Sequence, residues 1–269
     1  MKAFLFYSIL VTAAFLLSSC EKVIKYNLSE SSPTLVIEAQ LSNVDDFSMV
    51  KLSKSKSFDD DNTLATVSNA FVTITSEFGM VDTLTETSAG LYKPHRLKAK
   101  PGRSYLLTVI VENKTYTATS TVPSFVKLDS LGFTSESFGM SKAGEDIYSA
   151  IPYYSDPLEV ENYYRFVEKI NGVTEKTLFV RNDTRTNGKI VTQILRNFGG
   201  TEIKKGNSVE ISMIQLDSNV YDYFYGLSQI SSDGGSSSGT PTNPKSNIIG
   251  GALGYFSAQT VQSLSTVVQ

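Results

Sequence analysis

The stretch YLLTVIVENKTYTATSTV, residues 105–122, decides the fold class of this chain. Both of its halves are rich in β-branched and aromatic residues, and a turn signal, Glu112-Asn113-Lys114, separates them. In the second half threonine occupies every other position, with Tyr116 and Ala118 between the threonines. Such a period of two places one kind of side chain on each face of a strand. The stretch therefore predicts a β-hairpin whose threonines face water.

The same alternation continues on the N-terminal side of the hairpin. Two segments show it, Leu35-Val36-Ile37-Glu38-Ala39 and Ala70-Phe71-Val72-Thr73-Ile74. Turn residues recur at short intervals, at Gly79, Gly90 and Pro101-Gly102. This spacing favours an antiparallel sandwich over strands that alternate with helices. We expect an immunoglobulin-like or transthyretin-like β-sandwich over residues 34–124.

The remaining half, residues 125–269, predicts a β-rich C-terminal domain with one aromatic helix. Short apolar segments are separated there by Asn-Gly and Gly-Gly pairs, which favour turns. Asp217 or Ser218 can cap a helix near 218–230, where aromatic residues follow at helical spacing. Residues 231–243 are rich in glycine and serine, which predicts a flexible loop. The fold class expected for the whole chain is mainly β.

The first residues have the layout of a secretory signal. Lys2 precedes an apolar run over residues 3–17, shorter than the roughly 20 residues that a membrane span needs. The run ends in Leu17-Ser18-Ser19-Cys20, which resembles a bacterial lipobox and contains the single cysteine of the chain. We expect a signal peptide over 1–19, lipidation of Cys20 and a polar tether over 20–33. The alternative is an ordinary secreted signal peptide with a chance cysteine.

An acylated Cys20 makes the lipid bilayer a partner, because each buried methylene contributes about 0.8 kcal/mol. The next residue is Glu21, not the aspartate that signals inner-membrane retention in enteric bacteria. We therefore expect a protein that is lipid-anchored in the outer membrane. Both the periplasmic and the extracellular leaflet stay open.

Composition excludes several classes of function. The sequence has 24 Lys and Arg against 27 Asp and Glu, so it lacks the basic excess of a nucleic-acid-binding protein. One histidine and one cysteine cannot build a multi-histidine or thiolate metal site. We expect no nucleic-acid partner, no metal and no cofactor.

Four groups of residues offer catalytic or metal-binding chemistry, and each has a simpler interpretation. The groups are His95; Asp156 with Glu159 and Glu161; Asp59-Asp60-Asp61-Asn62; and Gly235–Gly239. Cationic neighbours disfavour a protonated or metal-bound histidine, and the three carboxylates lie in a polar loop without a sugar cleft. The acidic run lacks the glycine and distal glutamate of a calcium loop, and the glycine-serine run lacks the setting of a nucleophile elbow. We expect that the protein is not an enzyme.

Aromatic density is the strongest functional signal. Tyrosines concentrate between positions 148 and 164 and again between 221 and 225. A tyrosine gives a large contact area with few torsions, so recognition surfaces use it often. The candidate ligand- or partner-binding residues are Tyr153, Tyr154, Tyr163, Tyr164, Tyr221 and Tyr225. The alternative is that these rings fill the core of the C-terminal half.

Two short motifs suggest a modification. Asp82-Thr83-Leu84 and Asp129-Ser130-Leu131 resemble the acceptor of Bacteroidota periplasmic O-glycosylation. Thr83 and Ser130 are therefore candidate glycosylation sites.

Taken in order, these features resemble the Bacteroidota outer-membrane lipoprotein family of domain of unknown function 4249 (DUF4249). The lipobox, the immunoglobulin-like half, the tyrosine-rich stretch 153–166 and the aromatic helix carry the resemblance. Its most specific part is NPKSNIIGGALGYF, residues 243–256. The family has no assigned activity, so the resemblance supplies no catalytic residues.

Members of this family are often encoded beside TonB-dependent outer-membrane transporters. The resemblance therefore implies an accessory subunit that docks on such a barrel and helps to capture or gate its ligand. The alternative is a stand-alone cell-surface carbohydrate-binding or adhesion lipoprotein. A subunit should place residues 221–225 and 248–256 on one apolar patch, whereas a sugar binder should show coplanar tyrosines rimmed by Asp, Asn or Arg in a groove.

Overall fold

The structure is a computed structural model that describes most of the chain after residue 32. The described residues are 33–55, 65–135, 146–197, 199–232 and 243–269. The predicted signal peptide, Cys20 and the tether before residue 33 lie outside them. So do the acidic run 59–62 and residues 233–242 of the predicted loop.

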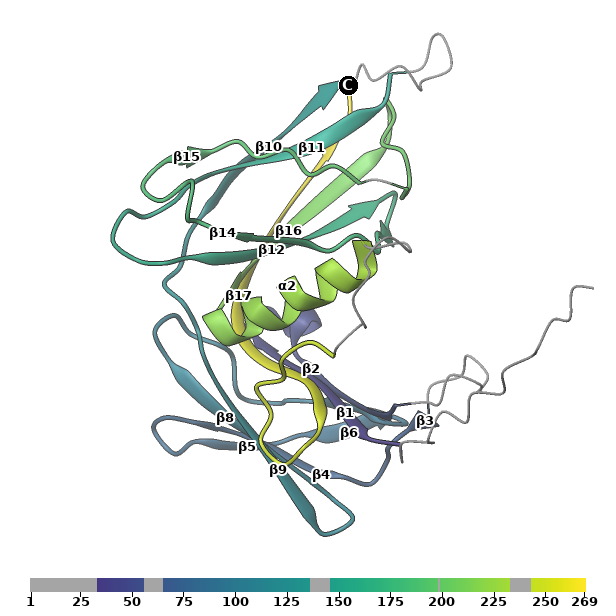
Figure 1. Ribbon diagram of the computed structural model, residues 1–269, viewed down its shortest axis with the longest axis vertical. Coiled ribbons are helices and arrows are strands. Elements are labelled where there is room, and N and C mark those ends of the chain that lie inside the picture. Colours follow the sequence, from purple (N-terminus) through teal and green to yellow (C-terminus); the bar gives the residue numbers. More distant parts are fainter. Residues whose placement is uncertain (1–32, 56–64, 136–145, 198, 233–242) are drawn as a thin grey trace, which may run out of the picture. The chain divides into compact units, whose positions relative to one another are not determined.

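The chain is mainly β, as the sequence predicts, with three sheets and one α-helix among the described residues (Figure 1). The large sheet has the order β13 (Val173–Thr174), β12 (Tyr163–Ile170), β16 (Ser208–Leu216), β17 (Leu253–Val267), β1 (Leu35–Ser42), β2 (Met49–Lys54), β7 (Leu91–Lys93), β6 (Thr85–Ser88), with β14 (Phe179–Asn182) paired to β12 and β3 (Ala65–Thr66) paired to β2. A second sheet has the order β5 (Val81–Thr83), β4 (Phe71–Ser76), β8 (Ser104–Val111), β9 (Lys114–Thr121). The third has the order β10 (Leu128–Ser135), β11 (Tyr148–Ser155), β15 (Ile190–Val191). The helical elements are η1 (Asp45–Phe47) and α2 (Ser218–Ser232).

The hairpin predicted over residues 105–122 is β8–β9. The two strands pair antiparallel, and Val111 faces Lys114 across a two-residue turn. Glu112 and Asn113 have φ of 50° and 63°, the left-handed geometry that matches such a turn to the twist of its strands. Along β9, Tyr116 and Ala118 are buried, as the alternation predicts.

The large sheet joins the two halves of the chain. β17 lies between β1, to which it is parallel, and β16, to which it is antiparallel. Ala258 and Phe256 of β17 are buried in the same apolar cluster as Ile37 of β1. The sandwich expected over residues 34–124 therefore includes a strand from the far end of the chain. Period-two patterning reveals the faces of a strand but not its neighbour, so the sequence did not predict this pairing.

A tight turn leads into β17. The side chain of Asn247 donates to the backbone oxygen of Phe256 (2.8 Å) and accepts from its backbone nitrogen (2.9 Å). Gly254 has φ +99°, and a Cβ there would lie 2.0 Å from the backbone oxygen of Ile37. This position accepts only glycine because β1 passes so close.

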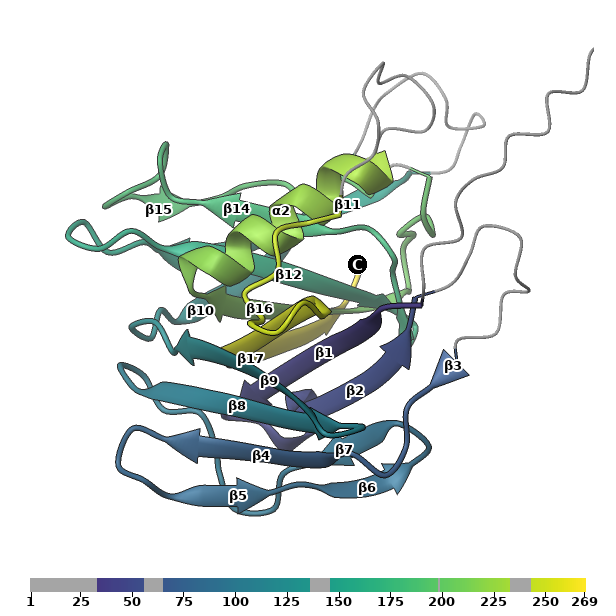
Figure 2. The ribbon, with the colours of Figure 1, turned by 60° about the horizontal axis from the view of Figure 1, so that its bottom comes forward.

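Helix α2 begins where the sequence predicts and ends two residues later. Asp217 caps it, because one carboxylate oxygen accepts from the backbone nitrogen of Val220 (3.0 Å) and the other accepts from the Ser120 hydroxyl of β9. The helix lies against β14, β12 and β17 of the large sheet (Figure 2). Its rings of Tyr223 and Phe224 contact Tyr255 of β17 at centroid distances of 4.9 and 4.7 Å. Within the part of the chain that the structure describes, no helix is long and apolar enough to cross a membrane.

Candidate ligand-binding site

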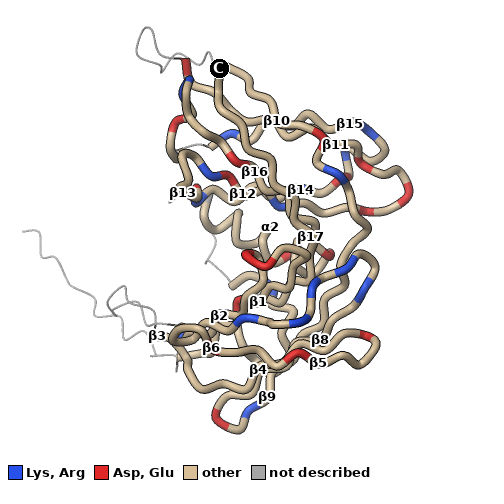
Figure 3. The backbone as a smooth tube through the Cα atoms, turned by 180° about the vertical axis from the view of Figure 1, so that it is seen from behind, with Lys and Arg blue, Asp and Glu red and all other residues tan. Residues whose placement is uncertain are grey.

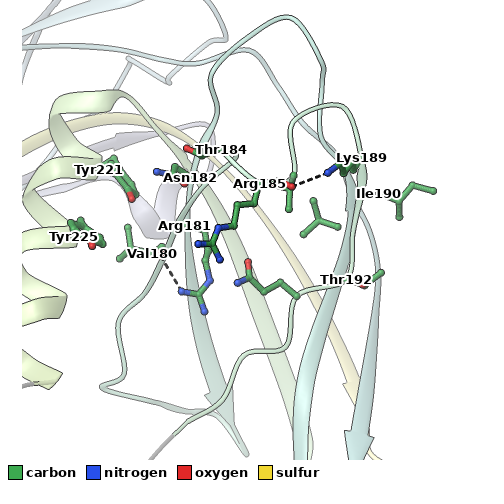
Figure 4. A pocket seen from close by; sticks show the side chains of 13 residues that line it. Val180, Arg181, Asn182, Thr184, Arg185, Lys189, Ile190, Thr192, Tyr221 and Tyr225 are labelled. Carbon is green, nitrogen blue, oxygen red and sulfur yellow. Dashed lines mark hydrogen bonds between the residues drawn. The ribbon is translucent and has the colours of Figure 1, made fainter.

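An open pocket lies between α2, β14 and the segment that leads into β15 (Figure 4). Its volume is about 730 Å³, within the range of roughly 300–1,000 Å³ typical of small-molecule sites. The lining residues are Val180, Arg181, Asn182, Thr184, Arg185, Thr186, Lys189, Ile190, Val191, Thr192, Gln193, Tyr221 and Tyr225. The pocket is thus walled by aromatic rings on the helix side and by polar and cationic side chains on the other.

Two tyrosines of α2 form the aromatic wall, and a third ring contacts one of them from outside the lining. Tyr221 and Tyr225 are one helical turn apart on α2, and their rings stack at 5.7 Å with planes 21° apart. Tyr163 of β12 is the third ring, 4.8 Å from Tyr221 and tilted by 34°. Tyr225 is 48% exposed, whereas Tyr221 is 9% exposed, so the outer ring is open to a ligand.

The hydroxyl groups of Tyr163 and Tyr221 stay protonated at neutral pH. The Tyr163 hydroxyl donates to a carboxylate oxygen of Glu161 (2.9 Å), and this contact with burial raises the pKa of Tyr163 to about 12. Burial also raises the pKa of Tyr221. The rings of Tyr163 and Tyr221 are therefore neutral, and the hydroxyl of Tyr163 is already used by Glu161.

Three cations face the tyrosines. Arg181 comes from β14, and Arg185 and Lys189 come from the segment before β15; basic positions lie beside β14 and β15 in Figure 3. Among the described residues, none of the three forms an ion pair, and the Nε of Arg181 is buried without a hydrogen-bond partner. Lys189 Nζ donates to the backbone oxygen of Arg185 (3.1 Å). This wall of the pocket therefore carries three cations that no described carboxylate holds in an ion pair.

Buried aspartates hold the cationic segment in place. A carboxylate oxygen of Asp183 accepts from the backbone nitrogen of Asn162 (2.9 Å), and its backbone oxygen accepts from Thr186 and Asn187 (2.7 Å each). At the other end, the backbone nitrogen of Asp156 donates to the backbone oxygen of Lys189 (2.9 Å). The turn that carries Arg185 is therefore fixed by backbone contacts.

The six predicted tyrosines fall into different environments. Tyr221 and Tyr225 line the pocket, and Tyr163 contacts Tyr221 without lining it. Tyr154 and Tyr164 are instead 2% and 1% exposed and contact each other in the core at 4.9 Å. The prediction that Tyr154 and Tyr164 bind a ligand or partner is wrong: these two rings fill the core of the C-terminal half, as the alternative stated. The ring of Tyr153 lies away from the pocket, against Gly132 of β10: a Cβ on that glycine would be 2.8 Å from a ring atom.

The sequence prediction missed the cations Arg181, Arg185 and Lys189. Their signal is a cluster of three cations within nine positions around the turn pair Asn187-Gly188. Such a cluster is common on solvated loops, so only the geometry distinguishes it.

A family model described as Domain of unknown function (DUF4249) matches residues 21–265 of the chain. The chain belongs to the DUF4249 family. The resemblance drawn from the sequence is thereby confirmed at the level of the family. None of the curated proteins matches this DUF4249 chain.

Among the described residues, the catalytic candidates of this DUF4249 chain have separate environments and partners. Asp156 is buried and accepts a 2.5 Å hydrogen bond from the Tyr164 hydroxyl, and burial raises its pKa. Glu161 is bound to Tyr163, and Glu159 is exposed on the surface. His95 is exposed, with Nε2 2.7 Å from the Thr85 hydroxyl. Over the described ranges, no three His, Cys, Asp or Glu side chains are grouped to hold a metal ion.

Both candidate glycosylation residues are exposed, Thr83 on β5 and Ser130 on β10. Asp82, however, has a structural role of its own. It is 3% exposed, and one carboxylate oxygen accepts from the backbone nitrogens of residues 95–97 at 2.6–3.0 Å. Its presence beside Thr83 is therefore explained without a modification, and glycosylation stays a prediction.

Proposed function

We propose that this DUF4249 protein is a non-catalytic binding protein that takes a carbohydrate in the pocket between α2 and β14. One observation carries the proposal: the stacked rings of Tyr221 and Tyr225 open into a hollow that Arg181 and Asn182 rim. Aromatic faces suit the apolar C–H faces of a sugar ring, and the neighbouring amide and guanidinium groups suit its hydroxyls. Near-parallel tyrosine rings beside Arg181 and Asn182 support the sugar-binding alternative, although the rings stack on each other instead of lying in one plane.

The cellular setting of the proposal comes from the sequence. The apolar run before Cys20 and the lipobox-like Leu17-Ser18-Ser19-Cys20 support a lipid anchor in the outer membrane. An anchored receptor holds its ligand at the cell surface or in the periplasm. Metabolic labelling with a palmitate analogue tests the anchor, which Cys20→Ala is expected to abolish.

Partnership with a TonB-dependent transporter is supported by the family resemblance alone. Its structural criterion was one apolar patch formed by residues 221–225 and 248–256. Tyr255 and Phe256 are 5% and 0% exposed, whereas Ile249 is 73% exposed, so Ile249 is the large apolar side chain that this segment offers to a partner. A pull-down of the lipidated protein from native membranes tests the partnership: a stoichiometric barrel supports it, and recovery of the lipoprotein alone counts against it.

A glycan array probed with the full chain tests the binding function. Tyr225→Ala is the variant of choice because its ring is half exposed and its loss leaves the core intact. We expect it to weaken glycan binding about tenfold, the effect of losing one stacked ring worth about 1 kcal/mol or slightly more. Phe78→Ala, which removes a 73% exposed ring outside the pocket, should bind as the wild type does. Equal binding by all three proteins would refute the site.

A further inference from the structure

We infer that the ligand of this pocket is a negatively charged saccharide, whose acid group lies between Arg181 and Arg185 while its ring lies against Tyr225. The inference rests on the proposed function and narrows it to one chemical class. The inference predicts that the pocket binds uronic acids and sulfated sugars in preference to the neutral sugars that aromatic stacking alone would accept.

The charge of the lining is the first argument. Its thirteen residues include three cations, Arg181, Arg185 and Lys189, and no aspartate or glutamate. The whole chain has a net charge of −3, so this concentration of positive charge is local. Positive charges that line a concave site raise the local concentration of anions. A neutral ligand would give none of the three cations an ion-pair partner.

The fixed backbone at the two arginines is the second argument. Arg181 pairs with Tyr164 in the β12–β14 ladder, and its Nε is buried with no hydrogen-bond partner in the described chain. Arg185 sits on the turn that Asp183 fixes through its backbone oxygen. The fixed backbone positions the base of each arginine side chain, and the planar fork of a guanidinium matches a carboxylate or sulfate through paired hydrogen bonds.

The arrangement of the walls is the third argument. Tyr221 and Tyr225 face the hollow from α2, while Arg181 and Arg185 point into it from the opposite side (Figure 4). Asn182, Thr184 and Gln193 supply neutral donors and acceptors in the same lining. An inorganic anion would use the arginines and leave the rings bare. A sugar that carries an acid group uses both walls at once.

Calorimetric titration of the full lipidated chain in detergent tests the inference. The probes are a galacturonic acid trimer, its neutral methyl ester, a sulfated galactose oligosaccharide and inorganic sulfate. We expect an acidic saccharide, carboxylated or sulfated, to bind about tenfold or more tightly than the methyl ester, and salt to weaken that binding. Which acidic probe binds better identifies the acid group. Inorganic sulfate should bind far more weakly than either.

The matched variants are Arg185→Gln and Arg96→Gln, because both arginines are exposed. Arg185→Gln should reduce the preference for the acid over the ester, because Arg181 and Lys189 remain in the lining, whereas Arg96→Gln should keep the full preference. Equal affinity for acid and ester, or an unchanged preference in Arg185→Gln, would overturn the charge inference while the proposed function survives. If no saccharide binds, charged or neutral, both fail.

Discussion

Glu168 on β12 places a carboxylate in the core. The residue is 1% exposed, and neither oxygen has a hydrogen-bond partner among the described residues. Burial disfavours the ionised form and raises the pKa of Glu168 from its usual 4.5 to about 7. Because the pKa is higher in the folded than in the unfolded state, the folded state binds the proton more tightly. Burial of Glu168 therefore does not change the free energy of unfolding below about pH 4.5, and it lowers that free energy as the pH rises through 7.

Glu168→Gln tests how much the ionised, buried carboxylate lowers the free energy of unfolding. The amide cannot ionise, so the variant should gain stability relative to the wild type at pH 8, by roughly 3 kcal/mol at most, and gain much less at pH 5. Urea unfolding at the two pH values measures the difference. Glu159→Gln, which changes an exposed carboxylate, is the control and should show no such pH dependence. A gain for Glu168→Gln that is equal at both pH values would contradict the account.

Gly254 is the residue that the close approach of β1 most strictly requires. In Gly254→Ala the new Cβ meets the backbone oxygen of Ile37, so we expect a loss of about 3 kcal/mol or more in the free energy of unfolding. Gly251 has a similar φ of +85°, but a Cβ added there would meet nothing within 4 Å, so Gly251→Ala should cost only about 1 kcal/mol. Denaturant titration compares the two. Equal losses would mean that the contact with Ile37 is unimportant.

Adjacent tyrosines show what the sequence could predict at this scale. Tyr163 and Tyr164 are neighbours on β12, and successive side chains of a strand lie on opposite faces of the sheet. The sequence therefore predicts that the two rings have different surroundings. Which face would meet α2 and which would meet the core depends on the strands and helix that pack on β12. Those partners come from distant parts of the chain and leave no local signal.

At the scale of elements, α2 supports the sheet as well as the pocket. The guanidinium of Arg165 on β12 lies 4.2 Å from the ring centre of Phe224, and its Nε has no hydrogen-bond partner within the described ranges. Burial lowers the pKa of Arg165. A buried cation against an aromatic face is stabilised by the ring, by about 2 kcal/mol when water is excluded.

Phe224→Leu separates the two roles of the helix. The variant keeps an apolar side chain but loses the aromatic face under Arg165, so the free energy of unfolding should fall by about 1–2 kcal/mol. Tyr225→Leu, one residue further along α2, should change stability by less than about 0.5 kcal/mol and still weaken glycan binding. Thermal melts and the glycan array provide the two readouts. A stability loss in Tyr225→Leu as large as that in Phe224→Leu would refute the separation.

A helix or turn was predictable where the residues that determine it are adjacent in the sequence. Asp217 and the aromatic spacing after it predicted α2, and Glu112-Asn113 predicted the turn of the β8–β9 hairpin. The partner of β17 was not predictable, because its parallel neighbour β1 begins more than two hundred positions earlier in the sequence. The pocket is not local either: it requires α2, β14 and the segment before β15 to converge.

At the scale of the whole molecule, β17 makes the two halves of the sequence depend on each other. It supplies ladder partners to both β1 and β16, so removing it exposes apolar faces in both halves. A chain truncated after Lys245 should therefore lose its cooperative unfolding transition and its resistance to protease in both halves. Persistence of a protease-resistant fragment over residues 34–124 would instead establish a sandwich that folds by itself.

The central claim is that the pocket between α2 and β14 binds an acidic sugar. The most direct measurement is a crystal structure of the protein grown with the galacturonic acid trimer. The account predicts a sugar ring against Tyr225 with its carboxylate between Arg181 and Arg185. Electron density for the trimer at any other surface, or an empty pocket in saturated crystals, would contradict it.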